Sequence, residues 1–146
     1  MKYELRKDQY LISTDKTLLK KALIHEFLSD SYWAKGVSQN VVEKTIENSL
    51  CFGVYKNIEQ VGYARVITDY TTFGYIADVF IVEEHRKRGL SEWLMRAILD
   101  HPELQGFRRW MLATKDAHSL YEKFGFTTLK NPGQFMELHN KDVSLY

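Results

Sequence analysis

The most chemically suggestive segment is a cluster of three cations, Arg86, Lys87 and Arg88, between an apolar run and Gly89. A helical pattern begins at Gly89, and cations near a helix N-terminus cost about 0.3–1 kcal/mol each. A bound phosphate would make the interaction energy of these cations favourable, and the free amides of a first helical turn bind anions. The spacing therefore predicts a phosphate-binding turn, and a solvated basic turn fits it about as well.

The residues of this turn also match a family signature. Arg86-x-x-Gly89-x-Ser91 resembles the coenzyme A pyrophosphate loop of the GNAT-type N-acetyltransferases, in which Gln or Arg, two residues, Gly and one residue precede Gly or Ala. Ser91 departs from the last position, but serine is small enough for the backbone to approach a pyrophosphate.

A second match lies downstream, at residues 117–126. Leu-Tyr-Glu-Lys (residues 120–123) followed by Gly125 resembles the later motif of the same family, where a short helix ends at Gly-Phe. The local pattern independently predicts this helix, because Asp116 favours its first turn, Lys123 its last turn, and Gly125 can close it. Thr114 stands where the family often has Asn. The resemblance covers roughly residues 50–138.

The resemblance implies acetyl-CoA as cosubstrate and no metal. The strand at 79–82 would pair with the pantetheine arm, and a free amide near Val79 or Phe80 would polarise the thioester carbonyl. His118 lies three residues before Tyr121, so contact with the cofactor and a surface or capping role are both open. The predicted cofactor-binding residues are Phe80, Ile81, Val82, Arg86, Lys87, Arg88, Gly89, Leu90, Ser91, Thr114, His118 and Tyr121.

Two residues are the predicted catalytic groups, Asp78 and Tyr121. Strand alternation places Ile76, Asp78, Phe80 and Val82 on one face, so Asp78 is expected among apolar side chains, where the neutral carboxyl is favoured. That suits a general base or an anchor for the substrate amine, and a purely structural carboxylate is the alternative. The resemblance implies that Tyr121 protonates the departing thiolate; without it, Tyr121 would be interpreted as a core tyrosine.

An aromatic pair, Tyr32 and Trp33, interrupts the helical pattern in the segment 29–36. The resemblance places this segment beside the acceptor, so both residues are predicted to line the substrate-binding cleft together with Asp78. An aromatic cover over the core is the alternative. The five histidines show no spacing typical of metal ligands.

Composition narrows the class of protein. The chain has 146 residues and a net charge of +1, which predicts one domain over 1–146 and no general attraction to nucleic acid. Its single cysteine, Cys51, is expected in the core and excludes an intramolecular disulfide. A charged start and no apolar run of about 20 residues argue against a signal segment and a membrane span. We therefore expect a cytoplasmic protein.

The hydrophobic pattern predicts an α/β (α+β) fold, with a mixed, largely antiparallel sheet flanked by about four helices. Expected strands are 10–13, 50–55, 61–68, 75–82, 110–113 and 135–138, and expected helices follow Asp15, Ser38 or Asn40, Gly89 and Ala117. Leu19, Ala22, Leu23 and Phe27 form the predicted apolar stripe of the first helix. Residues 140–146 are expected to be a loose tail.

The resemblance implies an N-acetyltransferase that moves an acetyl group to a primary amine by direct attack in a ternary complex. The acceptor could be a polyamine, an amino acid, an aminoglycoside-like compound or a protein amine. The alternatives are a non-catalytic acyl-CoA sensor and a polyanion-binding module that uses the 86–88 cluster with Arg108 and Arg109. A monomer and a homodimer are both compatible with the sequence.

Overall fold

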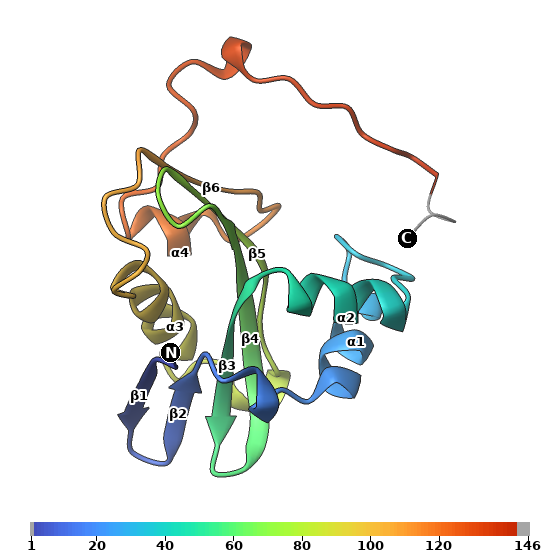
Figure 1. Ribbon diagram of the computed structural model, residues 1–146, viewed down its shortest axis with the longest axis vertical. Coiled ribbons are helices and arrows are strands. Elements are labelled where there is room, and N and C mark those ends of the chain that lie inside the picture. The colour runs from blue at the N-terminus through green and yellow to red at the C-terminus, as the bar shows by residue number, and fades with distance from the viewer. Residues whose placement is uncertain (1, 143–146) are drawn as a thin grey trace.

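The fold is built on one six-stranded sheet, seen in a computed structural model that describes residues 2–142. The strands lie in chain order, and every neighbouring pair is antiparallel except β5 and β6, which are parallel (Figure 1). The mixed sheet predicted from the sequence is therefore confirmed. The strands are β1 (Glu4–Lys7), β2 (Tyr10–Ser13), β3 (Leu50–Lys56), β4 (Glu59–Thr68), β5 (Phe73–Ile81) and β6 (Arg109–Leu112).

Helices cover both faces of this sheet (Figure 1). The helices α1 (Lys21–Asp30) and α2 (Gln39–Glu47) lie on one side, and α3 (Leu90–Leu99) and α4 (His118–Glu122) lie on the other. Short 3-10 turns, η1 (Lys16–Leu18), η2 (Glu83–His85) and η3 (Pro132–Gln134), connect them. The crossover helix α3 between β5 and β6 explains why that pair alone is parallel.

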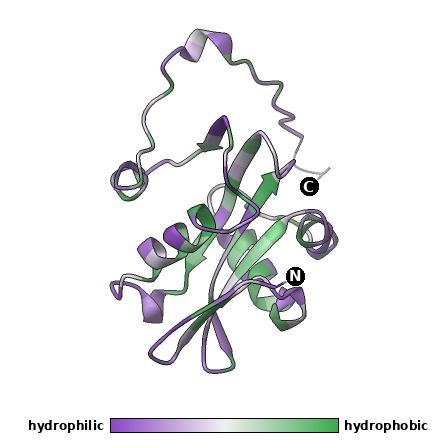
Figure 2. Ribbon diagram, turned by 60° about the vertical axis from the view of Figure 1, so that its left-hand side comes forward, coloured by the Kyte–Doolittle hydropathy of each residue, from purple (hydrophilic) through white to green (hydrophobic). Residues whose placement is uncertain are grey.

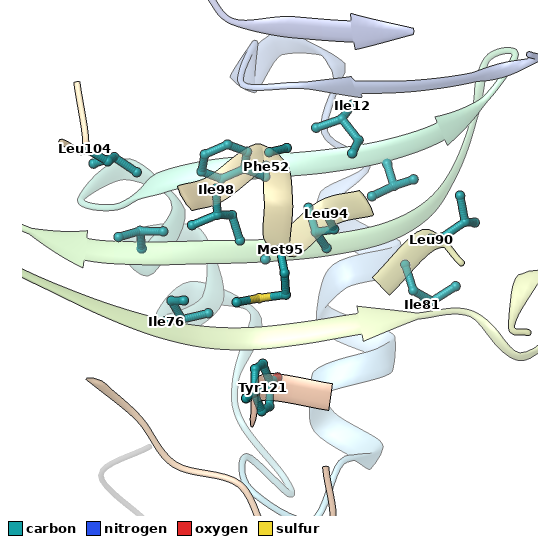
Figure 3. Close-up of a cluster of buried hydrophobic side chains, with 14 of the residues drawn as sticks. Ile12, Phe52, Ile76, Ile81, Leu90, Leu94, Met95, Ile98, Leu104 and Tyr121 are labelled. Carbon is teal, nitrogen blue, oxygen red and sulfur yellow. The ribbon is translucent and has the colours of Figure 1, made fainter. Parts of the chain in front are cut away.

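Each face has its own apolar core. On the α3 side, Leu94, Met95 and Ile98 are fully buried against the central strands (Figure 3). On the other side, Ile24 of α1 and Val42 of α2 pack against Tyr63 and Phe80 of the sheet. The central strands are hydrophobic along most of their length (Figure 2), as expected for a sheet covered on both faces.

The first helix differs from its prediction. Asp15 caps η1 by accepting from the Thr17 amide at 3.0 Å, and α1 begins only at Lys21. Its buried residues are Ile24 and Leu28, which lie four positions apart on one face. Ala22 is exposed, and Leu23 and Phe27 are half-buried, so the predicted stripe was displaced by about one residue. Ser38 does cap α2, as one of the two predicted alternatives.

A bulge interrupts β5 at Asp78, where the backbone φ is 56°. Arg65 pairs with Ala77 whereas Tyr63 pairs with Phe80. Between these pairs β5 has two residues, 78 and 79, and β4 has one, Ala64. As a result Ile76 lies in the core on the α3 side, while Phe80 lies in the core on the α1–α2 side. The predicted regular alternation, with Ile76 and Phe80 on one face, is therefore wrong.

The two ends of the chain also differ from prediction. The strand β1 was missed, because a charged edge strand lacks the apolar pattern of a core strand. No strand forms at 135–138 in the described part of the chain; Phe135 is half-buried, and residues 136–138 are exposed. Of the predicted loose tail, residues 140–142 are irregular, and residues 143–146 lie outside the described residues.

Within residues 2–142, no helix is both long enough and apolar enough to cross a bilayer.

Candidate active site

The parallel strands β5 and β6 separate part of the way along β5. Pairing extends only from Phe73–Ile76 to the residues of β6, yet β5 continues to Ile81. A groove of ≈590 Å³ lies where the strands part. Predicted site residues from three regions of the sequence line it: Tyr32, Trp33, Asp78, Thr114 and Tyr121.

Asp78 is held by two donors at the bulge. The Arg65 Nε donates to Asp78 Oδ2 at 2.5 Å, and the Trp33 indole Nε1 donates to Oδ1 at 2.9 Å. The side chain of Asp78 is 9% exposed and that of Arg65 is 16% exposed. The expectation of a carboxylate among apolar neighbours only is therefore wrong. Asp78 is one half of an ion pair inside the groove.

Arg65 was missed by the sequence analysis, although a signal existed. It is the charged residue within the mainly apolar part of β4, whose other charge, Glu59, lies at the exposed start, and charges in such strands are rarely left unpaired. Its Nη1 also donates to Ser49 Oγ at 3.2 Å, which fixes the guanidinium plane. The orientation of the Asp78 carboxylate is therefore set by Arg65, which Ser49 holds in place, and by Trp33.

The Tyr32–Trp33 segment crosses the mouth of the groove. The Lys115 amide donates to the Tyr32 hydroxyl at 3.0 Å, and the Lys115 ammonium lies 5.5 Å from the centre of the Tyr32 ring. Trp33 is 39% exposed and packs edge-on against Tyr32. The segment thus joins the β6–α4 connection on one side to Asp78 on the other.

Tyr121 lies at the margin of the α3-side core, beyond Met95 and Ile76 in Figure 3. Only 8% of the residue is exposed, yet within residues 2–142 its hydroxyl has no hydrogen-bond partner. Burial raises the pKa of the Tyr121 phenol, and nearby Tyr32 and Asp116 act in the same direction. The group is therefore a protonated donor at the border of the groove, and its oxygen is not one of the fully buried unpartnered atoms of the described chain.

Tyr121 also borders a second groove, of ≈740 Å³, between β6 and the segment after α4. His118 lies on this groove, as the three-residue spacing suggested. Thr114 borders both grooves, and its Oγ1 accepts from the Ala117 amide at 3.0 Å. The hydroxyl of Thr114 is thus already used to begin α4.

The basic turn has the geometry of an anion site. Lys87 and Gly89 adopt positive φ angles of 63° and 76°, and Gly89 precedes the first residue of α3. No side chain caps α3, and the amides of its first three residues, 90–92, have no acceptor in the described chain. A Cβ placed on Gly89 would meet nothing within 4 Å, so the space above it is open to a ligand. The turn therefore fits a phosphate group.

Several residues predicted to bind the cofactor have side chains that are buried or bonded to the protein itself. The Arg86 Nε donates to the Ile81 carbonyl at 2.9 Å, so this side chain braces the turn against the end of β5. Phe80, Ile81 and Leu90 are 4%, 5% and 6% exposed. The side chains of these three residues are therefore largely closed to a ligand. Lys87, Arg88 and Gly89 are exposed, while Val82 and Ser91 are half-buried.

Other reactive groups lie outside the groove. Cys51 is 1% exposed, as predicted, and burial raises the pKa of its thiol. Among the described residues, no three His, Cys, Asp or Glu side chains converge as metal ligands would.

Comparison with known proteins identifies the fold. The model of the Acetyltransferase (GNAT) family matches residues 17–126. A provisionally named acetyltransferase of Gibberella zeae is 34% identical and aligns with 78% of this chain and 76% of its own length. A provisionally named GNAT-family acetyltransferase structure from Xanthomonas campestris pv. campestris is 48% identical, with a TM-score of 0.89 over 92% of this chain and 96% of that one.

A more distant structure, from Clostridium acetobutylicum, was solved with acetyl-CoA. It is 13% identical, covers 95% of this chain and 96% of its own, and has a TM-score of 0.64, so it shares the fold. The chain belongs to the GNAT family of acetyltransferases. Acetyl-CoA is the acetyl donor of that family.

Proposed function

We propose that this protein transfers the acetyl group of acetyl-CoA to a primary amine by direct attack in a ternary complex, with residues 1–146 acting as one domain. The observation that carries the proposal is the groove where β5 and β6 part. It brings to the same space an oriented carboxylate, Asp78, and a phenol, Tyr121, whose hydroxyl has no hydrogen-bond partner within residues 2–142. Those are the two proton-handling groups that aminolysis of a thioester requires.

The basic turn is the proposed site for the pyrophosphate. The amides of Leu90 and Ser91 would donate to it, Gly89 would let the backbone approach, and Lys87 and Arg88 would balance its charge. Arg86 supports the turn through Ile81. The pantetheine arm would follow the free edge of β5 at Phe80–Val82, which β6 leaves unpaired.

Acetyl-CoA supplies an acetyl group already activated as a thioester. A backbone amide near Val79 or Phe80 would donate to its carbonyl oxygen, a contribution often worth about 3 kcal/mol. The bulge at Asp78 supports this role, because a bulged strand leaves amides outside the regular ladder.

Asp78 would receive the acceptor. Its carboxylate accepts a hydrogen bond from the amine and takes up the proton, directly or through water, as the nitrogen bonds to the acetyl carbon. The C–S bond then breaks, and Tyr121 donates its proton to the sulfur. Burial disfavours the thiolate as well as the phenolate, so the raised pKa of Tyr121 does not prevent this transfer.

The acceptor enters beside Tyr32 and Trp33 in this proposal. Arg65 already balances the charge of Asp78. The groove therefore offers a hydrogen-bond acceptor for a single amine, and it lacks the strongly negative potential that would attract a polycation. A small or flexible molecule with an accessible primary amine fits that chemistry best.

Calorimetric titration of acetyl-CoA at fixed salt tests the cofactor. We expect binding by the wild type and at least tenfold weaker binding by Arg88→Glu, whose side chain is exposed beside Gly89. Turnover of a panel of primary amines then tests transfer. Binding without turnover of any amine would favour the acyl-CoA sensor, and absence of binding would overturn the proposal.

A further inference from the structure

The outer edge of β6 is open along its whole length. β6 ends the strand order, and in residues 2–142 only β5 pairs with it. Two grooves of ≈450 and ≈740 Å³ follow this edge, between β6 and the segment 126–129. Both grooves are bordered by Trp110 and Met111 on one side and by the segment 126–129 on the other. The space between β6 and residues 126–129 therefore borders an unpaired strand edge, to which an extended segment could add.

The chain also contains a strand-like segment without a partner. Residues 135–139 alternate between apolar and polar side chains towards their end, a pattern typical of a half-buried strand. Met136 is 97% exposed and Leu138 is 101% exposed, and residues 136–139 make no hydrogen bond within the described chain. Figures 1 and 2 show this segment arching away from the sheet. We call residues 135–140 the C-terminal arm.

The start of the arm is anchored, which sets its direction. The 3-10 turn η3 (Pro132–Gln134) is closed by bonds from the Gln134 amide to Asn131 and from the Phe135 amide to Pro132. The Arg109 guanidinium lies 5.1 Å from the centre of the Phe135 ring. Pro132 restricts the backbone at this turn. Phe135 thus still lines the ≈450 Å³ groove beside the first residue of β6, and the arm leaves that groove only beyond Phe135.

We propose that the C-terminal arm of one copy of this chain occupies the slot along β6 of a second copy, and that the exchange is reciprocal. An open strand edge pairs with an extended segment through backbone hydrogen bonds, and alternate side chains enter pockets on one face. Met136 and Leu138 are those alternate side chains. Exchange of identical segments gives a closed two-fold dimer at low cost, because the contacts are ones the chain already encodes.

The exchange also completes the proposed active site, a consequence that rests on the proposed function. The ≈740 Å³ groove is bordered by His118 and Tyr121, so a strand inserted along β6 forms its missing wall. Each site is then built from two chains.

The first test is the mass in solution at micromolar concentration, measured by light scattering. We expect twice the 17.2 kDa of one chain for the wild type and a single chain for the double variant Met136→Asp with Leu138→Asp. Ile58→Asp is the matched control, since Ile58 is an apolar side chain 89% exposed in the β3–β4 turn, and it should remain dimeric. A monomeric wild type, or a dimeric double variant, would overturn the exchange.

The second test distinguishes the arm of a neighbour from the chain's own arm. A photo-crosslinking amino acid replaces His139, which leaves Met136 and Leu138 intact. Unlabelled and ¹⁵N-labelled chains are refolded together, irradiated and digested. Random pairing predicts that about half of the cross-links between the arm and β6 or residues 126–129 join light to heavy peptides. Cross-links of matched label only would mean that each arm folds onto its own chain, which would refute the proposal.

Both readouts are independent of acetyl transfer. A dimer with mixed cross-links but no acetyl-CoA binding would support the exchange and overturn only the proposed function.

Discussion

Arg65 and Asp78 form a largely buried ion pair between β4 and β5, and the same carboxylate accepts from the indole of Trp33. Each Asp78 oxygen therefore has its own donor, one from the sheet and one from the loop above it. A carboxylate held in this way keeps its orientation before any substrate arrives, which is what a group that positions an amine requires.

Removing Arg65 should destabilise the fold more than removing the pair. Arg65→Met leaves the Asp78 charge buried without a counter-ion, and we expect the free energy of unfolding to fall by about 3 kcal/mol. Adding Asp78→Asn removes that charge, so the double variant should recover much of the loss. Urea denaturation of the double variant and of both single variants measures the coupling, and a double-variant loss equal to the sum of the two single losses would show that the pair contributes none.

Asp78→Asn alone should keep cofactor binding while slowing transfer, although the free energy of unfolding should also fall because the buried Arg65 loses its counter-ion. Asn tolerates the left-handed conformation at position 78 and can still accept from Trp33, but it cannot take up a proton. We expect kcat/KM for an amine to fall by about 10²-fold or more. Steady-state kinetics with calorimetry of acetyl-CoA separates the two effects, and unchanged kinetics would assign Asp78 a structural role.

Tyr121→Phe should separate catalysis from stability unusually cleanly. The hydroxyl has no hydrogen-bond partner within residues 2–142, so its removal should change the free energy of unfolding by no more than about 0.5 kcal/mol. If this hydroxyl protonates the sulfur, kcat should fall by about 10²-fold while acetyl-CoA binding is kept. A variant with normal kcat would exclude Tyr121 as the proton donor.

Gly89→Ala should weaken acetyl-CoA binding beyond its effect on folding. An alanine at φ 76° costs about 1 kcal/mol of strain, and its methyl group would enter the open space proposed for the phosphate. Gly106→Ala is a close control, because Gly106 has a φ of 78° and equally open surroundings outside the basic turn. Equal calorimetric affinities of the two variants would argue against the anion site.

Stability should fall steeply in alkali. Burial raises the pKa values of Tyr55, Tyr63 and Tyr121 in the folded state, whereas unfolded tyrosines ionise near pH ~10. The unfolded chain then loses protons that the folded chain keeps, so the contribution present below about pH 10 is lost as the pH rises.

Each such tyrosine contributes a slope of about 1.4 kcal/mol per pH unit above that point. Tyr63→Phe should therefore show a shallower decline than the wild type when urea midpoints are compared from pH 8 to about 11.5. Parallel declines in the two proteins would contradict the assignment to Tyr63.

The sequence predicted most of the core strands and helices, because their apolar periodicity is local. It could not predict the partners of Asp78, since Trp33 lies 45 residues away and Arg65 lies 13 residues away. The left-handed bulge at Asp78 was also invisible in the pattern, and it moved Ile76 and Phe80 to opposite faces.

The prediction of a C-terminal strand was wrong for a related reason. The alternation in 135–138 indicates that the segment can form a strand, but pairing depends on which edge it meets. Local propensity says nothing about that edge, and the predicted strand at 135–138 does not form in the described chain.

The crossing of Tyr32 over the groove has a kinetic consequence. The bond from the Lys115 amide and the bond from Trp33 to Asp78 are the hydrogen bonds that fasten this segment across the mouth. Each is worth about 1 kcal/mol net, so the closed arrangement exceeds the open one by only a modest population ratio. If the acceptor enters beside Tyr32 and Trp33, as we propose, these two bonds must break for entry and product release, and we then expect this opening to limit turnover.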